Sequence, residues 1–309
     1  MRADLRARRG DRPGAGEAIA LAAALAPDDR DLAAIAARVA AIVEGPAVRH
    51  RRDHGSLTLL TDRPGADDAA LLADLAALPG QLALALPALA RGRSERPRRV
   101  VVLEAPAYHR WLAARGVAAG PDDRLFVDGA GGDVIALREP ASLRFRLRRG
   151  LTLVWLEEQG LPGLPPWLRE ALADAFAEPP GGAPSAARLE QLEVLATGWS
   201  RRPPLIDVAT GLRRPSELAL PALERALGWA LVARCLAPGA RVARFDEGDD
   251  ALLGEVLDDY LRRLAAPGAG SARLEHAWVQ TFHELDLPAL EQDLRAALQA
   301  MAPQVRWEP

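Results

Sequence analysis

The sequence contains no lysine and no asparagine, so all 39 of its basic side chains are arginines. The codons of the two missing residues are AT-rich, and their absence indicates a GC-rich genome before it says anything about function. The 42 acidic side chains leave the chain with a net charge of −3. A protein that coats nucleic acid needs a basic face that releases counterions, so this balance argues against nucleic-acid binding.

Cysteine and long apolar runs are scarce as well. Cys235 is the single cysteine, which excludes an intramolecular disulfide framework and a cysteine-based zinc site. Because Cys235 lies in the apolar run 230–236, we expect a buried structural thiol. No stretch of about 18 apolar residues occurs, so we expect no membrane span.

The composition that remains is that of an ordinary globular protein, with 49% hydrophobic and 26% charged residues among 309. Residues 15–26 and 30–44 are alanine-rich, so we predict that residues 1–45 form a flexible N-terminus and a helical pair. Arginines precede the apolar residues 18–26, as in a signal peptide. We interpret that stretch as a helix and expect a cytoplasmic protein, with secretion as the alternative.

Strand patterns follow in the next part of the chain. Residues 99–104 (RVVVLE) have consecutive apolar side chains, which indicates a strand buried on both faces. Residues 56–61 predict a short strand. Residues 124–128 and 134–138 flank a glycine-rich turn and predict a β-hairpin. Residues 45–53 are interpreted as a basic connector.

Helices dominate the rest of the prediction. Ser142 is a possible N-cap, and residues 250–265 have the strongest amphipathic pattern. The predicted helices cover residues 67–90, 106–115, 142–159, 166–177, 186–196, 216–236, 250–265, 272–284 and 287–301. The fold class is therefore α+β, with a small mixed β-sheet and helices over residues 55–178 and a helical C-terminal subdomain over residues 179–309.

Two neighbouring predicted helices carry the most specific pattern. The first contains LRRGLTLVWL at residues 147–156, and the second begins with PPWLREALADAF at residues 165–176. This pair resembles the core of the peptidase-MA-like gluzincin family, whose members are mostly bacterial and are related in fold to thermolysin-type zinc metallopeptidases. In that family the first helix carries H-E-x-x-H and the second reads P-x-W-L-x-E-G-x-A-E-Y-F.

Flanking segments support the resemblance, which covers about residues 55–302. The matching features are the strand at 100–103, the helix at Tyr108, the glycine-rich hairpin at 129–133, ALGWALV at 226–232 and FHELDLPALE at 282–291.

The resemblance implies a zinc site whose chemistry is known. Two histidines four residues apart on one helical face bind Zn²⁺, the glutamate after the first activates the bound water, and a glutamate on the next helix completes the ligand set. In this chain the first histidine position is Arg149, the general-base position is Gly150 and the second histidine position is Leu153. The third ligand is retained as Glu170, and the carboxylate that supports the ligands in the family is Asp174.

These replacements predict a degenerate site without catalytic residues. A zinc hydrolase needs about three protein ligands. Arg149 stays protonated and Leu153 has no donor atom, so we expect no metal and no cofactor. Two interpretations of Glu170 stay open: it forms an ion pair with Arg149 that replaces the metal as a crosslink, or it is solvated on its helix.

Two other groups of residues are weighed in the same way. His50 and His54 have the i, i+4 spacing of metal ligands, but they lie in the basic connector without a following glutamate, so a solvated connector is preferred. The arginines in RFRLRR at residues 144–149 are expected on a solvated helix face, with an anion-binding cleft as the alternative.

The sequence thus predicts a catalytically inactive, metallopeptidase-like protein, a pseudopeptidase. We expect it to bind or scaffold a peptide or protein partner through the former active-site cleft, where an edge strand can capture an extended peptide. One alternative is an active zinc-dependent peptidase or hydrolase with a non-standard ligand set. Another is a structural subunit that docks through its N-terminal helices.

Overall fold

The computed structural model describes residues 17–21, 24, 48–90, 98–114, 124–128, 133–159, 164–179, 184–201, 222–244, 250–266, 277 and 279–307. The chain divides into two compact units. The first, called the sheet unit, comprises Met1–Ala77 and Ser94–Val154, and the second, called the helical unit, comprises Leu78–Arg93 and Trp155–Pro309.

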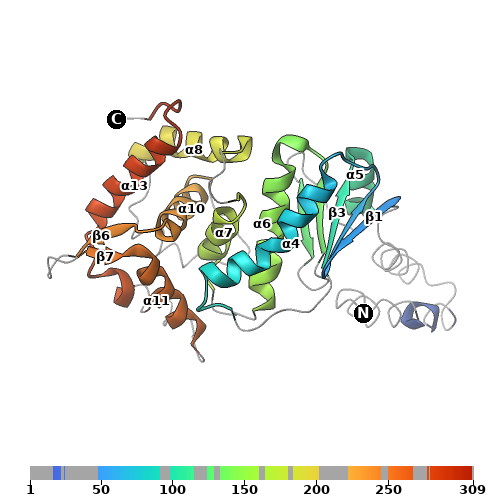
Figure 1. Ribbon diagram of the computed structural model, residues 1–309, viewed down its shortest axis with the longest axis horizontal. Helices are drawn as coiled ribbons and strands as arrows, with labels where there is room; N and C mark the ends of the chain where they lie inside the picture. The colour runs from blue at the N-terminus through green and yellow to red at the C-terminus, as the bar shows by residue number, and fades with distance from the viewer. Residues whose placement is uncertain are drawn as a thin grey trace. The chain divides into compact units, whose positions relative to one another are not determined.

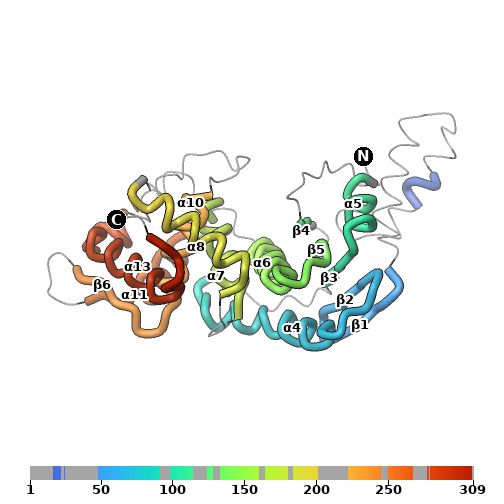
Figure 2. The backbone as a smooth tube through the Cα atoms, turned by 90° about the horizontal axis from the view of Figure 1, so that it is seen from above, coloured from blue at the N-terminus to red at the C-terminus, as the bar shows by residue number. Residues whose placement is uncertain are grey.

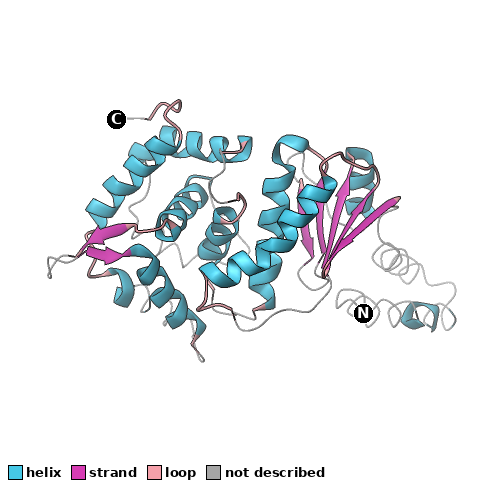
Figure 3. Cartoon of the chain, in the orientation of Figure 1, coloured by secondary structure: helices cyan, strands magenta, loops and turns pink. Residues whose placement is uncertain are grey.

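The sheet unit contains a five-stranded mixed sheet with the order β1-β2-β3-β5-β4, drawn in magenta in Figure 3. The three inner strands run parallel, and each outer strand is antiparallel to its neighbour. The strands are β1 (His50–His54), β2 (Leu57–Thr61), β3 (Arg98–Leu103), β4 (Leu125–Asp128) and β5 (Asp133–Leu137).

Helices pack on both faces of this sheet, as Figures 1 and 2 show: α5 (Ala105–Ala114) on one face and α6 (Pro140–Glu158) on the other. The central strand β3 therefore has no solvent-facing side. Its residues Val100 to Leu103 are all at most 2% exposed, which confirms the prediction of burial on both faces.

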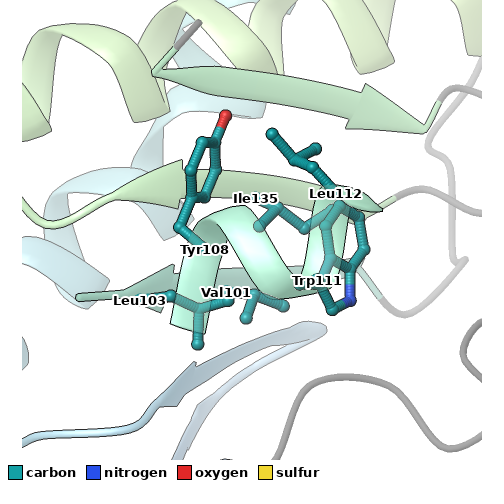
Figure 4. Packing of buried hydrophobic residues seen from close by; sticks show 6 residues of the cluster. All are labelled: Val101, Leu103, Tyr108, Trp111, Leu112 and Ile135. Carbon is teal, nitrogen blue, oxygen red and sulfur yellow. The ribbon is translucent and has the colours of Figure 1, made fainter. Parts of the chain in front are cut away.

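The α5 face of the sheet has a compact apolar core (Figure 4). Tyr108, Trp111 and Leu112 from α5 pack against side chains from β3 and β5. Trp111 also meets Phe126 of β4 edge to face, with ring centroids 5.4 Å apart. Because β3 residues alternate between faces, Val101 and Leu103 join this core while Val100 and Val102 face α6.

A buried ion pair links α6 to α4 (Asp68–Ala85). The guanidinium of Arg148 is fully buried and donates to Oδ1 of Asp74 at 2.9 Å. Burial lowers the pKa of Arg148, and the charge and hydrogen bond of Asp74 oppose this effect. Arg146 is also buried and binds Glu139 at 2.6 Å. The predicted solvated arginine face is therefore wrong for Arg146 and Arg148.

In the helical unit, α10 lies at the centre, and α7, α8, α11 and α13 all contact it (Figure 1). Residues 226–232 of α10 are buried without interruption, as expected of a helix that is apolar on every side. α7 packs against α10 at Gly228, where an added Cβ would lie 3.5 Å from Ala171 Cβ, an ordinary van der Waals contact. The elements are α7 (Pro166–Ala175), α8 (Ala186–Gly198), η1 (Trp199–Arg201), α10 (Ala222–Leu236), β6 (Arg241–Ala243), β7 (Asp250–Leu252), α11 (Leu253–Ala265) and α13 (Leu287–Met301).

The structure confirms the coarse prediction, an α+β protein with a small mixed sheet, and corrects several details. Residues 50–54 form strand β1 instead of a connector, with Gly55 at a positive φ of 59° in the turn to β2. The helix predicted from Ser142 begins at Pro140. Residues 250–252 form β7, which pairs with β6, so the helix predicted from residue 250 begins at Leu253.

Parts of the prediction fall outside the described residues. These are most of the helical pair at residues 15–44 and much of the predicted helix at 272–284. The three-part division into residues 1–45, 55–178 and 179–309 stays a prediction.

In the described part of the chain, α4 is the one helix long and apolar enough to cross a membrane, with a mean hydropathy of 1.3. The core helices of soluble proteins meet the same criterion of length and composition. Leu72, Leu75 and Leu78 of α4 are at most 4% exposed, and Asp74 on the same helix binds Arg148.

The Arg148–Asp74 pair gives a test of this packing. Asp74→Ala leaves the Arg148 charge buried without its counterion, so we expect a loss of about 3–5 kcal/mol in the free energy of unfolding, measured by urea denaturation. Arg144→Ala is the matched control: Arg144 lies 3.4 Å from the same carboxylate but is half exposed, so its loss should cost less than about 1 kcal/mol. Equal costs for the two variants would contradict the assignment.

Candidate functional site

The general-base position of the resembled family, Gly150, lies in the contact between α6 and the sheet. A Cβ at Gly150 would lie 2.6 Å from Cγ1 of Val134 on β5 and 3.3 Å from Cδ1 of Leu125 on β4. Real Cβ atoms essentially never approach another atom to 2.6 Å, so the backbone of α6 sits too close to the sheet for any larger residue. Gly150 is therefore required by the packing of this fold.

The two histidine positions, Arg149 and Leu153, lie one turn apart on α6. Leu153 is 8% exposed and forms part of the apolar core, while the Arg149 side chain is partly exposed. Neither supplies a metal-binding atom at neutral pH. Among the residues that the structure describes, no three His, Cys, Asp or Glu side chains come together as metal ligands would.

The two carboxylates that match the family's pattern, Glu170 and Asp174, lie on α7 in the helical unit. Glu170 is partly exposed, whereas Asp174 is fully buried. Asp174 accepts two hydrogen bonds from the guanidinium of Arg225 on α10, at 2.8 and 3.0 Å, and one from Nε2 of Gln191 on α8, at 3.0 Å. This bidentate pair crosslinks α7 to α10 where the family would need support for a metal ligand.

Arg225 is the cation of this carboxylate cluster. Burial lowers its pKa, but the hydrogen bonds and charge of Asp174 together with the charge of Glu170 outweigh burial, so the pKa of Arg225 is raised. Sequence reasoning missed Arg225, because a lone arginine about 50 residues away from its partner carries no signal in one sequence. The predicted pair between Arg149 and Glu170 joins residues of different units and stays a prediction, as does the predicted absence of a metal.

A second arginine, which is buried, completes the cluster. Arg188 of α8 is 2% exposed, donates to Oε2 of Glu178 at 3.3 Å and to the backbone carbonyl of Asp174, and stacks 3.8 Å from the ring centre of Trp229. Burial lowers the pKa of Arg188, while the charges of Glu178 and Asp174 oppose this. The cluster therefore stabilises the contact of α7, α8 and α10.

The structure also decides whether His50 and His54 can bind one metal ion and whether Cys235 can act as a nucleophile. His50 and His54 are exposed at opposite ends of β1, and four residues of strand span about 13 Å, so they cannot share one metal ion. Cys235 is 2% exposed, as predicted, and burial raises the pKa of its thiol to about 12. The thiol is neutral at physiological pH and unsuited to nucleophilic attack.

The edge strand β4 lies beside Gly150 and is the outermost described strand on its side of the sheet. The N–H of Leu137 donates to the carbonyl of Arg124 at 3.0 Å, which makes 124 and 137 a hydrogen-bonded pair. Hydrogen-bonded and non-bonded pairs alternate in an antiparallel ladder, so the backbone N–H and C=O groups of Leu125 and Val127 point away from β5.

Comparison of the sequence with protein-family models and with curated proteins gives no match.

The contact at Gly150 predicts a specific mutational result. Gly150→Ala should lower the free energy of unfolding by about 1–3 kcal/mol because its Cβ overlaps Val134. In a Val134→Ala background the same change should cost much less, which a double-mutant cycle by urea denaturation would measure. Gly80→Ala is the matched control, since Gly80 is also helical but has no atom within 4 Å of the added Cβ. A costly Gly80→Ala or a harmless Gly150→Ala would contradict the packing argument.

The two retained carboxylates should differ sharply in their importance for stability. Asp174→Asn removes the buried charge that holds Arg225, so we expect a loss of about 3–5 kcal/mol in the free energy of unfolding. Glu170→Gln, one turn earlier on the same helix, should change it by less than about 1 kcal/mol. Thermal and urea denaturation of both variants would show whether the cluster depends on Asp174.

Proposed function

We propose that this chain is a catalytically inactive, metallopeptidase-like protein that binds an extended segment of a peptide or protein partner along β4. The observation that carries the proposal is the position of β4: it is an edge strand that lies directly beside the α6 position where the family has its catalytic base. The partner would occupy the place of a substrate without being cleaved.

The backbone of β4 supplies the means of binding. The N–H and C=O groups of Leu125 and Val127 point away from β5, so an added strand can form main-chain hydrogen bonds with them. The opposite edge, β1, is less suitable. Its sequence HRRDH is charged and exposed at every residue, and Arg51 binds Asp53 at 3.0 Å. Charged edge strands of this kind resist pairing with another chain.

The residues on α6 lack the side chains that a zinc peptidase needs for catalysis. Arg149 and Leu153 replace the histidines, and the close approach of Gly150 to Val134 leaves no room for a glutamate. The proposal therefore predicts that changing these positions back, as Arg149→His, Gly150→Glu and Leu153→His together, produces an unstable protein and no peptidase activity.

Strand addition is tested with peptides selected against the full chain. A library of random peptides displayed on phage supplies the probe, and one selected peptide is synthesised for titration calorimetry. Val127→Pro removes an outward N–H without removing a β4–β5 hydrogen bond, so we expect at least about a tenfold loss of affinity. Val127→Ala removes similar side-chain volume and keeps the N–H, so its affinity should stay within about threefold.

Three outcomes would overturn the proposal. These are equal affinities for the proline and alanine variants, failure to select any peptide, and cleavage of the bound peptide. Cleavage that is abolished by a chelator, with stoichiometric zinc in the purified protein, would establish the alternative of an active hydrolase. Selection that succeeds with the full chain but fails after deletion of residues 1–45 would place the binding surface on the N-terminal segment.

A further inference from the structure

The edge strand β4 has a sequence that complements itself when it is read in the opposite direction. Residues 124–128 are RLFVD, with a basic residue first, an acidic residue last and Phe126 at the midpoint between two aliphatic residues. In an antiparallel pair of identical strands, each position lies opposite the position that mirrors it across the midpoint. A pair centred on Phe126 therefore places Leu125 opposite Val127 and position 124 opposite position 128.

The backbone of β4 permits this register. The N–H and C=O groups of Leu125 and Val127 point away from β5, whereas those of Phe126 point toward it. Two residues that exchange hydrogen bonds in an antiparallel ladder lie directly opposite each other. With Phe126 at the centre, Leu125 lies opposite Val127 of a second copy, so the outward groups of both residues find partners. A register shifted by one residue would oppose outward groups to inward ones.

The side chains of β4 also complement those of a second copy. Leu125 and Val127 lie on the α6 face of the sheet, because their methyl carbons would be 3.3 and 3.5 Å from a Cβ at Gly150. Phe126 lies on the other face, where its ring meets Trp111. Leu125, Phe126 and Val127 are each only partly buried. Pairing would place aliphatic side chains together on one face and the two Phe126 rings together on the other, and such directly opposed pairs stabilise antiparallel sheets.

Charge favours self-pairing of β4 and opposes self-pairing of the other edge, β1. Arg124 binds Glu139 at 2.7 Å, but its side chain is 44% exposed beside the edge. The register puts it opposite position 128, which is an aspartate. In β1, a pair centred on Arg52 would place two arginines directly opposite each other, and HRRDH offers no apolar side chain. Opposed unlike charges stabilise a strand pair, and opposed like charges destabilise it.

We propose that the partner bound by β4 is a second copy of this chain, and that the two β4 strands pair antiparallel about Phe126. The inference rests on the proposed function, because it names the occupant of the same edge. Both copies contribute the same residues, so the contact closes as a two-fold dimer and does not extend into a fibre. The paired strands are short, and small interfaces are typical of transient association. We therefore expect a reversible dimer with a Kd of about 1–100 µM.

The test is a charge exchange across the strand pair, measured on the full chain by analytical ultracentrifugation. Arg124→Asp and Asp128→Arg each place like charges opposite each other at both ends of the pair, so each should raise the dimer Kd at least about tenfold. An equimolar mixture of the two variants opposes unlike charges again and should form a heterodimer within about threefold of the original Kd. Arg51→Asp on the exposed edge β1 is the matched control and should leave the Kd unchanged.

Restored association in the mixture would exclude unfolding of either variant as the cause of its loss. A chain that stays monomeric up to about 1 mM, a Kd that does not respond to the charge changes, or a mixture that fails to associate would refute the self-pairing.

A peptide selected for binding to β4 separates this inference from the proposed function. Because the peptide and the second copy use the same outward groups, saturating peptide should dissociate the dimer. Peptide binding that depends on the N–H of Val127 in a chain that never dimerises would refute the self-pairing and leave the proposed function standing. Peptide binding that leaves the dimer intact would refute the self-pairing as well, whereas a chain that binds neither peptide nor a second copy would refute both.

Discussion

Ion pairs between an arginine and a carboxylate of another helix, with one member fully buried, are the interaction on which both units depend. In the sheet unit, Arg148 of α6 is fully buried against Asp74 of α4. In the helical unit, the fully buried Asp174 of α7 is held by Arg225 of α10. A charge without its partner at these depths costs several kcal/mol, so each pair fixes which face its two helices turn toward each other. The planar fork of Arg225 binds both oxygens of Asp174, which a lysine could not do, and this chain contains no lysine.

The close contact of α6 with the sheet explains why position 150 is a glycine. In the resembled family this position is the catalytic glutamate, so the sequence alone suggests that Gly150 marks the loss of that residue. Its position against Val134 shows that the helix has settled on the sheet at a distance that only glycine permits. If the resemblance to zinc peptidases holds, this packing excludes the base at position 150, which supports the proposed binding role of the adjacent strand β4. The carboxylate of Asp174 is used for packing.

Elements with a strong apolar signal could be predicted from the sequence, and weakly patterned ones could not. The run at residues 100–103 identified a buried strand, and the helix predicted at residues 287–301 coincides with α13. Strand β1 was missed because HRRDH has no apolar face, and it is a strand only because β2 offers it hydrogen bonds. Strand β7 was absorbed into the predicted helix α11, since three residues cannot reveal their pairing with β6.

By itself, the sequence predicted the α+β class, the positions of most helices and the buried central strand. These follow from local propensity and periodicity, which a single chain displays along its length. The tertiary structure decided which charged side chains form ion pairs and which positions can hold a side chain larger than that of glycine. The partnership of Asp174 with Arg225 and the steric limit at Gly150 are contacts between segments distant in sequence. Because the chain has no lysine, every basic side chain had to be an arginine. Which of these arginines are buried depends on how the helices pack.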